Sequence, residues 1–418
     1  MARDAPRSLR ILLSEGSSTS AREAVTILGL AGHRVEICDP ARFPLARFSR
    51  FPARWHRCPP MRDDPLEFLA FVEELLARER FDVLLPIHEQ GFLFARFPER
   101  LAGTGLALPG FDNYRAVHSK AGFHRVLDHL GLPQPATQIV RGADQLRAAA
   151  RMPCVIKTSI GTASRGVWMV RDEVDLEAAL RELKAADGFE DEVLVQALAE
   201  GFTEKAQGVF GHGDLLGFHA YRQLAEGAGG GDARKTSVRR DAVRAGLAMI
   251  GKHLDWHGAL SVDYIWTAAG PLYIDANPRL VEPMAAELAG TGLVGLLLQV
   301  SAGEAPEPLP ESRHGVVTHQ AMQALLGRAQ RGGTRRDVWR ELLDLVRRRG
   351  AYAGSAEELT PLRHDPFSAV PLAITALALL VSPRSAHALA HRGWGRHLLG
   401  PRTVRMMEAG GAGSDASH

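Results

Sequence analysis

Two aspartates and an asparagine late in the chain are residue types suited to binding a hard metal cation. Asp263 stands in one apolar run, and Asp275 and Asn277 alternate in the next, which predicts the two strands of a hairpin. Alternate residues of a strand share a face, so Asp275 and Asn277 should point the same way. Facing carboxylates repel unless a cation or proton lies between them, and their oxygens suit Mg²⁺. Taken alone, the motif also fits a solvated hairpin with scattered aspartates.

The turn of this hairpin determines whether the two aspartates face each other. Pro271 lacks a backbone donor, so we expect it in a loop of about five residues, 267–271, and outside the ladder. Trp266 and Leu272 would close this loop. That register predicts the two aspartate side chains directly opposite each other, on the face that carries the asparagine.

The lysines of this chain are informative because they are rare. The sequence has 6 lysines against 44 arginines, and lysine supplies a compact point charge that the planar guanidinium does not replace. Lys157 ends an apolar run and precedes a small, flexible loop, 158–166, which contains Ser164 and Gly166. Such a loop can direct backbone N–H groups at phosphates. Lys120 opens a predicted helix and could likewise reach a phosphate, although an ordinary turn and a surface lysine also explain each feature alone.

Composition restricts the class of protein. The chain has 418 residues, of which 45% are hydrophobic and 23% charged, with a formal net charge of +2. These values exclude a disordered or fibrous protein and argue against nucleic acid as a partner. Cys38, Cys58 and Cys154 are too few and too widely spaced for a disulfide framework or a zinc site. Together with an N-terminus that lacks a long apolar run, they predict a cytoplasmic protein.

Three predicted regions must position the candidate residues. Residues 1–113 alternate strand and helix signals, which predicts a small doubly wound α/β domain with a parallel sheet. Residues 114–304 combine short strands with Gly-containing turns, which predicts an α+β domain with largely antiparallel strands. A Pro-rich linker then opens a basic helical extension, 305–418, with a disordered end.

One segment of the extension, 369–381, is almost wholly apolar. It is shorter than the roughly 18 residues that a membrane span requires. A buried or partner-facing helix is therefore the favoured interpretation. Contact with a membrane surface, promoted by flanking arginines, is the less favoured one.

Several short motifs follow one another in a characteristic order over residues 8–300. They are Ser119-Lys120, Gly131-Leu132-Pro133-Gln134-Pro135, Val155-Ile156-Lys157 with its loop, Val193-Leu194-Val195-Gln196 with Gly201, Val262-Asp263-Tyr264, and Asp275-Ala276-Asn277-Pro278-Arg279. In this order the chain resembles the ATP-grasp superfamily, most closely its carbamoyl-phosphate-synthase-like and biotin-carboxylase-like branch. The resemblance implies two α+β subdomains that hold ATP between them, with a nucleotide-binding subdomain at about 140–198. It also implies a preceding Rossmann-like domain.

The resemblance assigns nucleotide contacts by position. The implied residues are Lys120, Lys157, Ser164, Gly166, Gln196, Ala197, Leu198 and Glu204. The two lysines would hold the phosphates, and the backbone at 196–198 would meet the adenine. Glu204, or Thr203 beside it, would bind the ribose. The acidic residue that the family carries in this hinge is absent at Ala197.

The resemblance also assigns metal and catalytic roles. Asp263, Asp275 and Asn277 would bind Mg²⁺, with Mn²⁺ as an alternative, although the family more often has glutamate among these ligands. Arg279 would face the transferring group. Arg222 and Lys235, on either side of a glycine-rich loop, are candidates for clamping the γ-phosphate or the substrate, and surface charges are the alternative.

Proteins of this superfamily typically use ATP to phosphorylate a carboxylate, and a nucleophile then attacks the acyl phosphate. The resemblance therefore predicts an ATP-dependent ligase that joins a small carboxylate to an amine. Two alternatives stay open: an enzyme that carboxylates or carbamoylates from bicarbonate, and an ATP-binding scaffold without turnover. A homodimer is compatible with the sequence.

The substrate side is less well defined by the sequence. Loop 15–20 and the pair His88-Glu89 follow predicted strands, where a chain commonly contacts an anion or a substrate. Helix capping is the alternative for both. Glu282, shortly after Arg279, could order that arginine or sense an amine.

Overall fold

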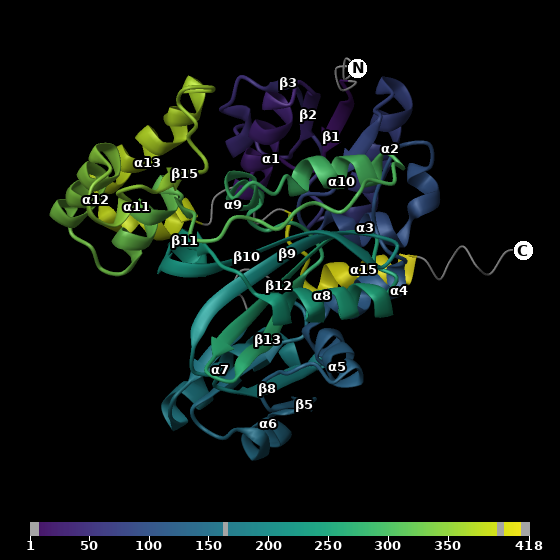
Figure 1. Ribbon diagram of the computed structural model, residues 1–418. Coiled ribbons are helices and arrows are strands. Elements are labelled where there is room, and N and C mark those ends of the chain that lie inside the picture. The colour runs from purple at the N-terminus through teal and green to yellow at the C-terminus, as the bar shows by residue number, and fades with distance from the viewer. Residues whose placement is uncertain (1–7, 162–165, 391–396, 411–418) are drawn as a thin grey trace, which may run out of the picture.

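The computed structural model describes residues 8–161, 166–390 and 397–410 and contains three sheets (Figure 1). The first sheet is wholly parallel, with the order β3-β2-β1-β4. This region consists of β1 (Arg10–Leu13), α1 (Thr19–Leu30), β2 (Arg34–Cys38), β3 (Pro52–His56), α2 (Pro65–Glu79), β4 (Val83–Leu85) and α3 (Gln90–Arg96). The predicted strand–helix alternation with a parallel sheet is therefore present. The finer assignment as a Rossmann-like domain stays a prediction.

The second sheet is antiparallel, with the order β5-β8-β6-β7. Its region consists of α4 (Phe111–His118), α5 (Lys120–Leu130), β5 (Thr137–Val140), α6 (Ala143–Ala149), β6 (Cys154–Thr158), β7 (Val167–Val170), α7 (Glu173–Ala185) and β8 (Val193–Ala197). Leu146, Ile156 and Leu180 belong to a small core of its own, because α6 and α7 supply apolar faces to the sheet. In Figure 1 this sheet, with α6 and α7, extends downward from the rest of the molecule.

The third sheet has seven strands in the order β13-β12-β9-β10-β11-β14-β15. It contains β9 (Phe202–Gly211), β10 (Asp214–Glu226), β11 (Asp232–Ser237), β12 (Gly258–Thr267), β13 (Gly270–Asn277), β14 (Val317–His319) and β15 (Ala356–Glu357). The accompanying helices are α8 (Asp241–His253), α9 (Pro283–Leu288) and α10 (Leu293–Ser301). Every neighbouring pair of strands is antiparallel except β14 with β15, so the prediction of largely antiparallel strands is correct.

The C-terminal region is helical but also contributes to this sheet. Its helices are α11 (Ala321–Gln330), α12 (Arg335–Arg347), α13 (Ala369–Val381), α14 (Ala386–Ala390) and α15 (Pro401–Gly410). β14 pairs with β11, so the chain after residue 305 completes the central sheet as well as forming helices. Sequence patterns missed β14 because three residues show no alternation. We expected residues 410–418 to be disordered; Gly410 is instead the last residue of α15, and 411–418 lie outside the described residues.

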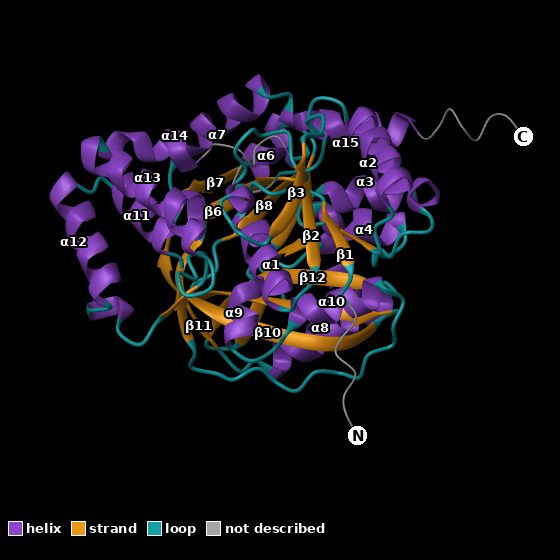
Figure 2. Cartoon of the chain, turned by 90° about the horizontal axis from the view of Figure 1, so that it is seen from above, coloured by secondary structure: helices purple, strands orange, loops and turns teal. Residues whose placement is uncertain are grey.

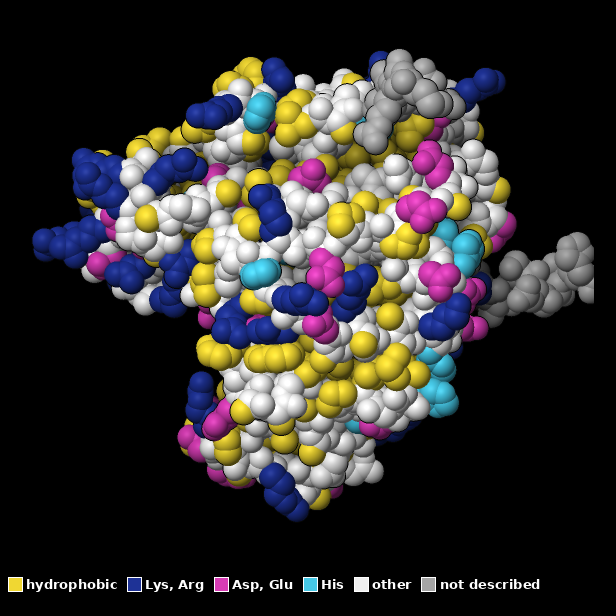
Figure 3. Space-filling model, in the orientation of Figure 1, with side chains coloured by type: hydrophobic (Ala, Val, Ile, Leu, Met, Phe, Trp, Pro, Cys, Tyr) yellow, Lys and Arg dark blue, Asp and Glu magenta, His cyan; other side chains and the backbone are white. Residues whose placement is uncertain are grey.

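The lobe formed by α11–α13 is strongly basic on its surface. Exposed arginines of α12 include Arg335, Arg336 and Arg340, and Figure 3 shows Lys and Arg side chains gathered at this side of the molecule. The predicted apolar segment forms α13 with the expected bounds. In the part of the chain that is described, no helix combines the length and apolarity that crossing a bilayer requires.

Apolar packing joins the first sheet to the central sheet. α10 carries a nearly continuous apolar sequence, and Leu296 and Val300 lie in one core with Val83 of β4 and Val209 of β9. From above, α10 and α1 lie between the parallel strands and the long antiparallel strands (Figure 2). This packing brings the carboxyl-terminal edge of the first sheet next to the face that carries the candidate site.

Candidate active site

The β12–β13 hairpin brings the two aspartates into register. Asp263 pairs with Asp275, as predicted. Ile274 is skipped in the pairing, because the register shifts between Asp263 and Tyr264. This irregularity of the β-bulge type produces the aspartate pairing.

The turn of the hairpin differs from the prediction. Thr267 pairs with Gly270, so the predicted five-residue loop is wrong and the connection is a tight turn. Pro271 lies inside the ladder opposite Trp266. A proline is tolerated there because β13 is an edge strand and needs no donor on its outer side. The extra residue that we predicted in the loop is instead Ile274, in the bulge.

Lys157 reaches from the second sheet to this hairpin. Its Nζ donates to Oε1 of Gln196 at 2.8 Å and to the carbonyl oxygen of Ile274 at 2.9 Å. The Lys157 residue is only 6% exposed. The bulged residue thus presents its carbonyl to the lysine next to the two paired aspartates.

Lys120 approaches the same aspartates from α5. Its Nζ lies 3.4 Å from Oδ2 of Asp275 and donates to the carbonyl oxygen of Gly161 at 2.6 Å. Ser119 caps the helix by accepting the N–H of Gly122, which fixes the start of α5. Lys120 and Lys157 therefore lie beside the aspartate pair, although they belong to different elements. Lys205, opposite Asp263 on β9, is a third lysine next to the pair, and its Nζ bonds to Asp232.

The pKa values of Lys157 and Asp263 indicate that both side chains lack sufficient opposite charge nearby. Burial lowers the pKa of Lys157 to about 8, with Asp275 opposing this change and Lys120 adding to it. Burial also raises the pKa of Asp263 to about 6, against the charge of Lys205 and with that of Asp275. Both shifts disfavour the charged forms. An arriving metal cation would stabilise the carboxylates, and an arriving phosphate would stabilise the ammonium groups.

The oxygen atoms on the hairpin fit a hard divalent cation. Oδ1 of Asp263 is buried and has no hydrogen-bond partner among the residues described, a costly state that a metal would relieve. The side chain of Asp275 is 29% exposed, so it is accessible from solvent. Oδ1 of Asn277 accepts a bond from Arg279 at 3.2 Å. Two carboxylates and an amide oxygen on paired strands are the donor set that Mg²⁺ prefers.

Protons should compete with metal for Asp263. Because its pKa is raised to about 6 in the metal-free protein, we expect affinity for Mn²⁺, used as a probe without nucleotide, to be full above pH 6. Below pH 6 the affinity should fall up to about tenfold per pH unit, since binding must displace a proton. Counting free Mn²⁺ by electron paramagnetic resonance between pH 5 and 7.5 measures this. Equal affinity at both ends would contradict the assignment of Asp263.

The residues expected at the adenine lie beside Lys157. Gln196 accepts from Lys157 and donates from Nε2 to Oγ1 of Thr137 at 3.0 Å. Ala197 ends β8, and its N–H donates to the carbonyl of Ala136 at 2.8 Å. Leu198 follows with 40% of its surface exposed. Gln196 thus contacts the lysine, and Leu198, directly after β8, offers an exposed apolar surface that suits contact with a planar ring.

The glycine-containing loop after Lys157 is closed by a contact that requires glycine. Gly166 has φ +73°, and its carbonyl accepts the N–H of Thr158 at 2.8 Å. A Cβ at this position would lie 2.1 Å from Oγ1 of Thr158. Ser164, the other candidate in this loop, lies outside the described residues.

Glu204 and Arg222 form a buried network. Glu204 is fully buried, and its oxygens accept bonds from Arg222, Arg240 and Tyr264. The guanidinium of Arg222 lies 3.8 Å from the centre of the Phe202 ring. Both oxygens of the expected ribose ligand are thus already occupied, and Arg222 is bonded to it.

Lys235 bonds to a different set of partners from Lys120 and Lys157. Its Nζ donates to Glu282 at 2.9 Å and to Glu358 at 2.6 Å, and the residue is only 1% exposed. These bonds commit the ammonium to carboxylates of the protein. A role for Lys235 at the γ-phosphate or the substrate stays a prediction, and in the structure its ammonium forms ion pairs with Glu282 and Glu358.

Arg279 faces the carboxyl-terminal edge of the first sheet. Burial and the charge of Arg279 lower the pKa of His88, which follows β4. Burial also lowers the pKa of His118 to about 4, and Lys120 and Arg279 act in the same direction. The hydroxyl of Tyr114 is buried without a partner among the described groups. The region between Arg279 and this edge is therefore polar and rich in uncharged donors and acceptors.

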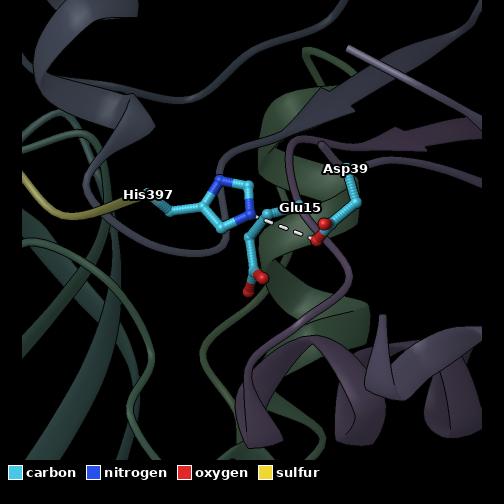
Figure 4. A group of neighbouring side chains, drawn as sticks. All are labelled: Glu15, Asp39 and His397. Carbon is cyan, nitrogen blue, oxygen red and sulfur yellow. Dashed lines mark hydrogen bonds and ion pairs between the residues drawn. The ribbon is translucent and has the colours of Figure 1, made fainter. Parts of the chain in front are cut away.

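Three further polar residues meet at this edge (Figure 4). Asp39 follows β2 and accepts from Nε2 of His397 at 3.1 Å, while Glu15 follows β1 and accepts the N–H groups of Ser17 and Ser18. All three are buried. Each carboxylate is thus satisfied by protein donors, and one oxygen of each lies within 4.8 Å of the other and of a ring nitrogen of His397. Loop 15–20 was expected here, whereas no local pattern marks Asp39 or His397.

Comparison with known proteins supports the fold. No family model matches the chain. An uncharacterized protein, y4rH, of Sinorhizobium fredii is 28% identical over 218 residues, which are 47% of this chain and 45% of that protein. The carbamoyl phosphate synthase large chain of Thermus thermophilus is 25% identical over 222 residues, 49% of this chain and 21% of that protein. The chain thus spans about half or less of the curated relatives it matches.

Solved structures match over most of the chain. The ADP complex of an N5-carboxyaminoimidazole ribonucleotide synthetase covers 81% of this chain and 86% of its own, with a TM-score of 0.61 and 16% identity. The fold is that of the ATP-grasp superfamily. The chain also matches the biotin carboxylase domain of Hydrogenobacter thermophilus 2-oxoglutarate carboxylase, bound to MgADP and bicarbonate (TM-score 0.58, 16% identity, 74% of each chain). An L-amino acid ligase of Bacillus licheniformis matches with a TM-score of 0.54 and 16% identity over 71% of this chain and 74% of that one.

Proposed function

We propose that this ATP-grasp chain is an ATP- and Mg²⁺-dependent ligase that activates a small carboxylate as its acyl phosphate and couples it to an amine. The observation that carries the proposal is the convergence of Lys157 and Lys120 on the Asp263–Asp275 pair. The solved proteins of the same fold are enzymes, and the matched structures include complexes with ADP.

The lysines supply fixed positive charge for the phosphates of ATP. Lys157 is held by Gln196 and the Ile274 carbonyl, so little conformational freedom is lost when it meets a phosphate. Lys120 projects from the capped start of α5 beside Asp275. Exposed Leu198 and the neighbouring backbone would meet the adenine. The nucleotide would thus lie between the second sheet and the hairpin.

Asp263, Asp275 and Asn277 would hold the metal. Magnesium, when bound, supplies positive charge that offsets the negative charge developing on the transferring phosphoryl group. Arg279 follows Asn277, and its planar guanidinium suits the two oxygens of a carboxylate. The carbonyl of Arg279 accepts from Oγ of Ser261 at 2.6 Å, which anchors the residue next to the hairpin. Arg279 would therefore orient the carboxylate toward the γ-phosphate.

Atoms and charges balance in two steps. A carboxylate oxygen attacks the γ-phosphorus, the bond to the ADP oxygen breaks, and an acyl phosphate remains. A neutral amine then attacks the acyl carbon, loses a proton and releases phosphate. An enzyme that starts from bicarbonate is the second candidate, because a matched structure of the same fold contains bicarbonate with MgADP. A scaffold without turnover is the third.

A screen with hydroxylamine tests the proposal. The protein is incubated with MgATP, hydroxylamine and single carboxylates, and ADP and hydroxamate are measured together. We expect both products, in equal amounts, with one class of carboxylate, since hydroxylamine traps an acyl phosphate without the natural acceptor. ADP release with bicarbonate alone would support the second candidate. Nucleotide binding without ADP release under any condition would reject the ligase.

A further inference from the structure

One face of the central sheet carries a continuous row of polar side chains. Cross-strand pairing aligns Asp263 with Lys205, and Lys205 with Tyr221, so all three share that face. Gln207, two residues along β9, is likewise opposite His219 of β10. The row begins at the candidate metal site and leads across the sheet toward Lys235.

The far end of this row is a cluster around Glu282. Gln207 holds the Glu282 backbone, donating from Nε2 to its carbonyl at 2.7 Å. Oε2 of Glu282 accepts from Nζ of Lys235 at 2.9 Å and from Nε2 of Gln320 at 2.6 Å. The side chain is 8% exposed, whereas that of Lys235 is 1% exposed and that of Glu358 is fully buried. Glu282 is thus the member of the cluster that reaches accessible space.

The cluster has more negative charge than its own cation offsets. Glu23, Glu282 and Glu358 lie close enough for one ion to touch all three, and Lys235 is the ammonium that bonds to this group. Three carboxylates against one ammonium leave two negative charges when all are ionised. Burial raises the pKa of Glu282 to about 7, with Lys235 opposing this and Glu358 adding to it.

Polar atoms without partners give a second, independent indication of a missing ligand. Both ring nitrogens of His219 are buried and without a hydrogen-bond partner in the described part of the chain, and the residue is fully buried. Thr318, which pairs with Lys235, has an unpartnered buried hydroxyl, and Oε1 of Glu358 is also unpartnered. Buried groups of this kind are rare unless a ligand or water meets them.

We propose that Glu282 binds an ammonium group of the substrate whose carboxylate faces Arg279, so that the substrate is an amino acid. This rests on the proposed function. Glu282 lies three residues after Arg279, and Oε2 is held by Lys235 and Gln320, while no bond occupies Oε1 among the described groups. Lys235 and Gln320 therefore position the carboxylate for a cationic donor.

The held amine belongs to the activated molecule. Carboxylates stabilise the protonated form of an amine, and an ammonium group has no lone pair with which to attack an acyl phosphate. The acceptor amine must reach the acyl carbon in its neutral form and so would not lie on Glu282. A metal ion fits the cluster less well, because Nζ of Lys235 and Nε2 of Gln320 already lie 2.6–3.0 Å from the oxygens it would need.

Kinetics of the full-length protein test this inference. ADP release with hydroxylamine is measured for amino acids and their deaminated counterparts, such as alanine against propionate and phenylalanine against 3-phenylpropionate. The wild-type protein should have a KM for the amino acid about 10- to 100-fold lower than for its counterpart. Glu282→Gln should remove this preference by raising the amino-acid KM, with the KM for ATP unchanged. Glu311→Gln, an exposed residue, is the matched control and should behave as wild type.

The outcomes separate the inference from the proposed function. Turnover that is equally efficient with deaminated carboxylates overturns the inference and leaves the ligase intact. No turnover with any carboxylate rejects both. The wild-type comparison alone decides the point if Glu282→Gln does not fold, which thermal unfolding will show. A metal tightly bound in the wild type and lost from Glu282→Gln would also overturn the ammonium site.

Discussion

Replacing Asp275 with alanine should lower the rate of ADP release by about 100-fold or more while leaving the protein folded. Asp275 lies opposite Asp263, and its Oδ2 is 3.4 Å from Nζ of Lys120. The substitution removes a proposed metal ligand together with the counter-charge of Lys120. The side chain is 29% exposed, so little apolar packing depends on it. Steady-state ADP release at saturating MgATP, with circular dichroism of the variant, measures both parts of the expectation.

The control for this substitution is Asp214→Ala. Asp214 likewise lies on a strand of the central sheet, but its side chain is 71% exposed and pairs with exposed Lys252. We expect its turnover to equal that of the wild type. Near-normal turnover of Asp275→Ala would exclude a metal role for the hairpin, and loss of turnover in Asp214→Ala would show that the assay reports on stability.

Replacing Lys157 with methionine should weaken binding of ADP and ATP by about 10- to 100-fold, because a charged contact to phosphate is lost. Methionine keeps most of the length of the side chain, which matters at a position that is only 6% exposed. Gln196 and the Ile274 carbonyl each lose one donor. Isothermal titration with MgADP gives the change in affinity, and thermal unfolding reports the cost of the lost hydrogen bonds.

Lys184→Met is the matched control, since Lys184 lies exposed at the end of α7 in the same region. It should bind MgADP as the wild type does. If Lys157→Met keeps full affinity and a wild-type melting temperature, the phosphate role of Lys157 is excluded. If it fails to fold, the titration is repeated with Lys120→Met, which tests the second lysine of the same site.

Contacts between residues close in sequence were predicted well. The hairpin that pairs Asp263 with Asp275 follows from alternation over two adjacent strands, and its pairing is as expected. The way in which this register arises was not predicted. A tight turn followed by a bulge at Ile274 gives the same pairing of the aspartates as the five-residue loop that we expected. The position of Lys157 near the end of a buried strand was likewise predicted, because this charged residue ends an apolar run in the sequence.

Contacts between distant segments were not predicted. Lys235 was a candidate for contact with the γ-phosphate or the substrate, and no local pattern predicted its bonds to Glu282 and to Glu358, which lies 123 residues later. Glu358 was never a candidate, because it follows a strand of only two residues. His397 reaches Asp39 across 358 residues of chain with no local pattern to mark either one.

By itself the sequence determined the chemistry that is available: scarce lysines, an aspartate pair with an asparagine, and an arginine directly after them. Alternation and turn residues were enough to place these on strands and loops, because neighbours in sequence decide local backbone structure. Only the tertiary structure decided which charges meet. Ion pairs such as Lys235 with Glu358 form because packing of β11 against β14 buries both, and burial makes an unpaired charge too costly to persist.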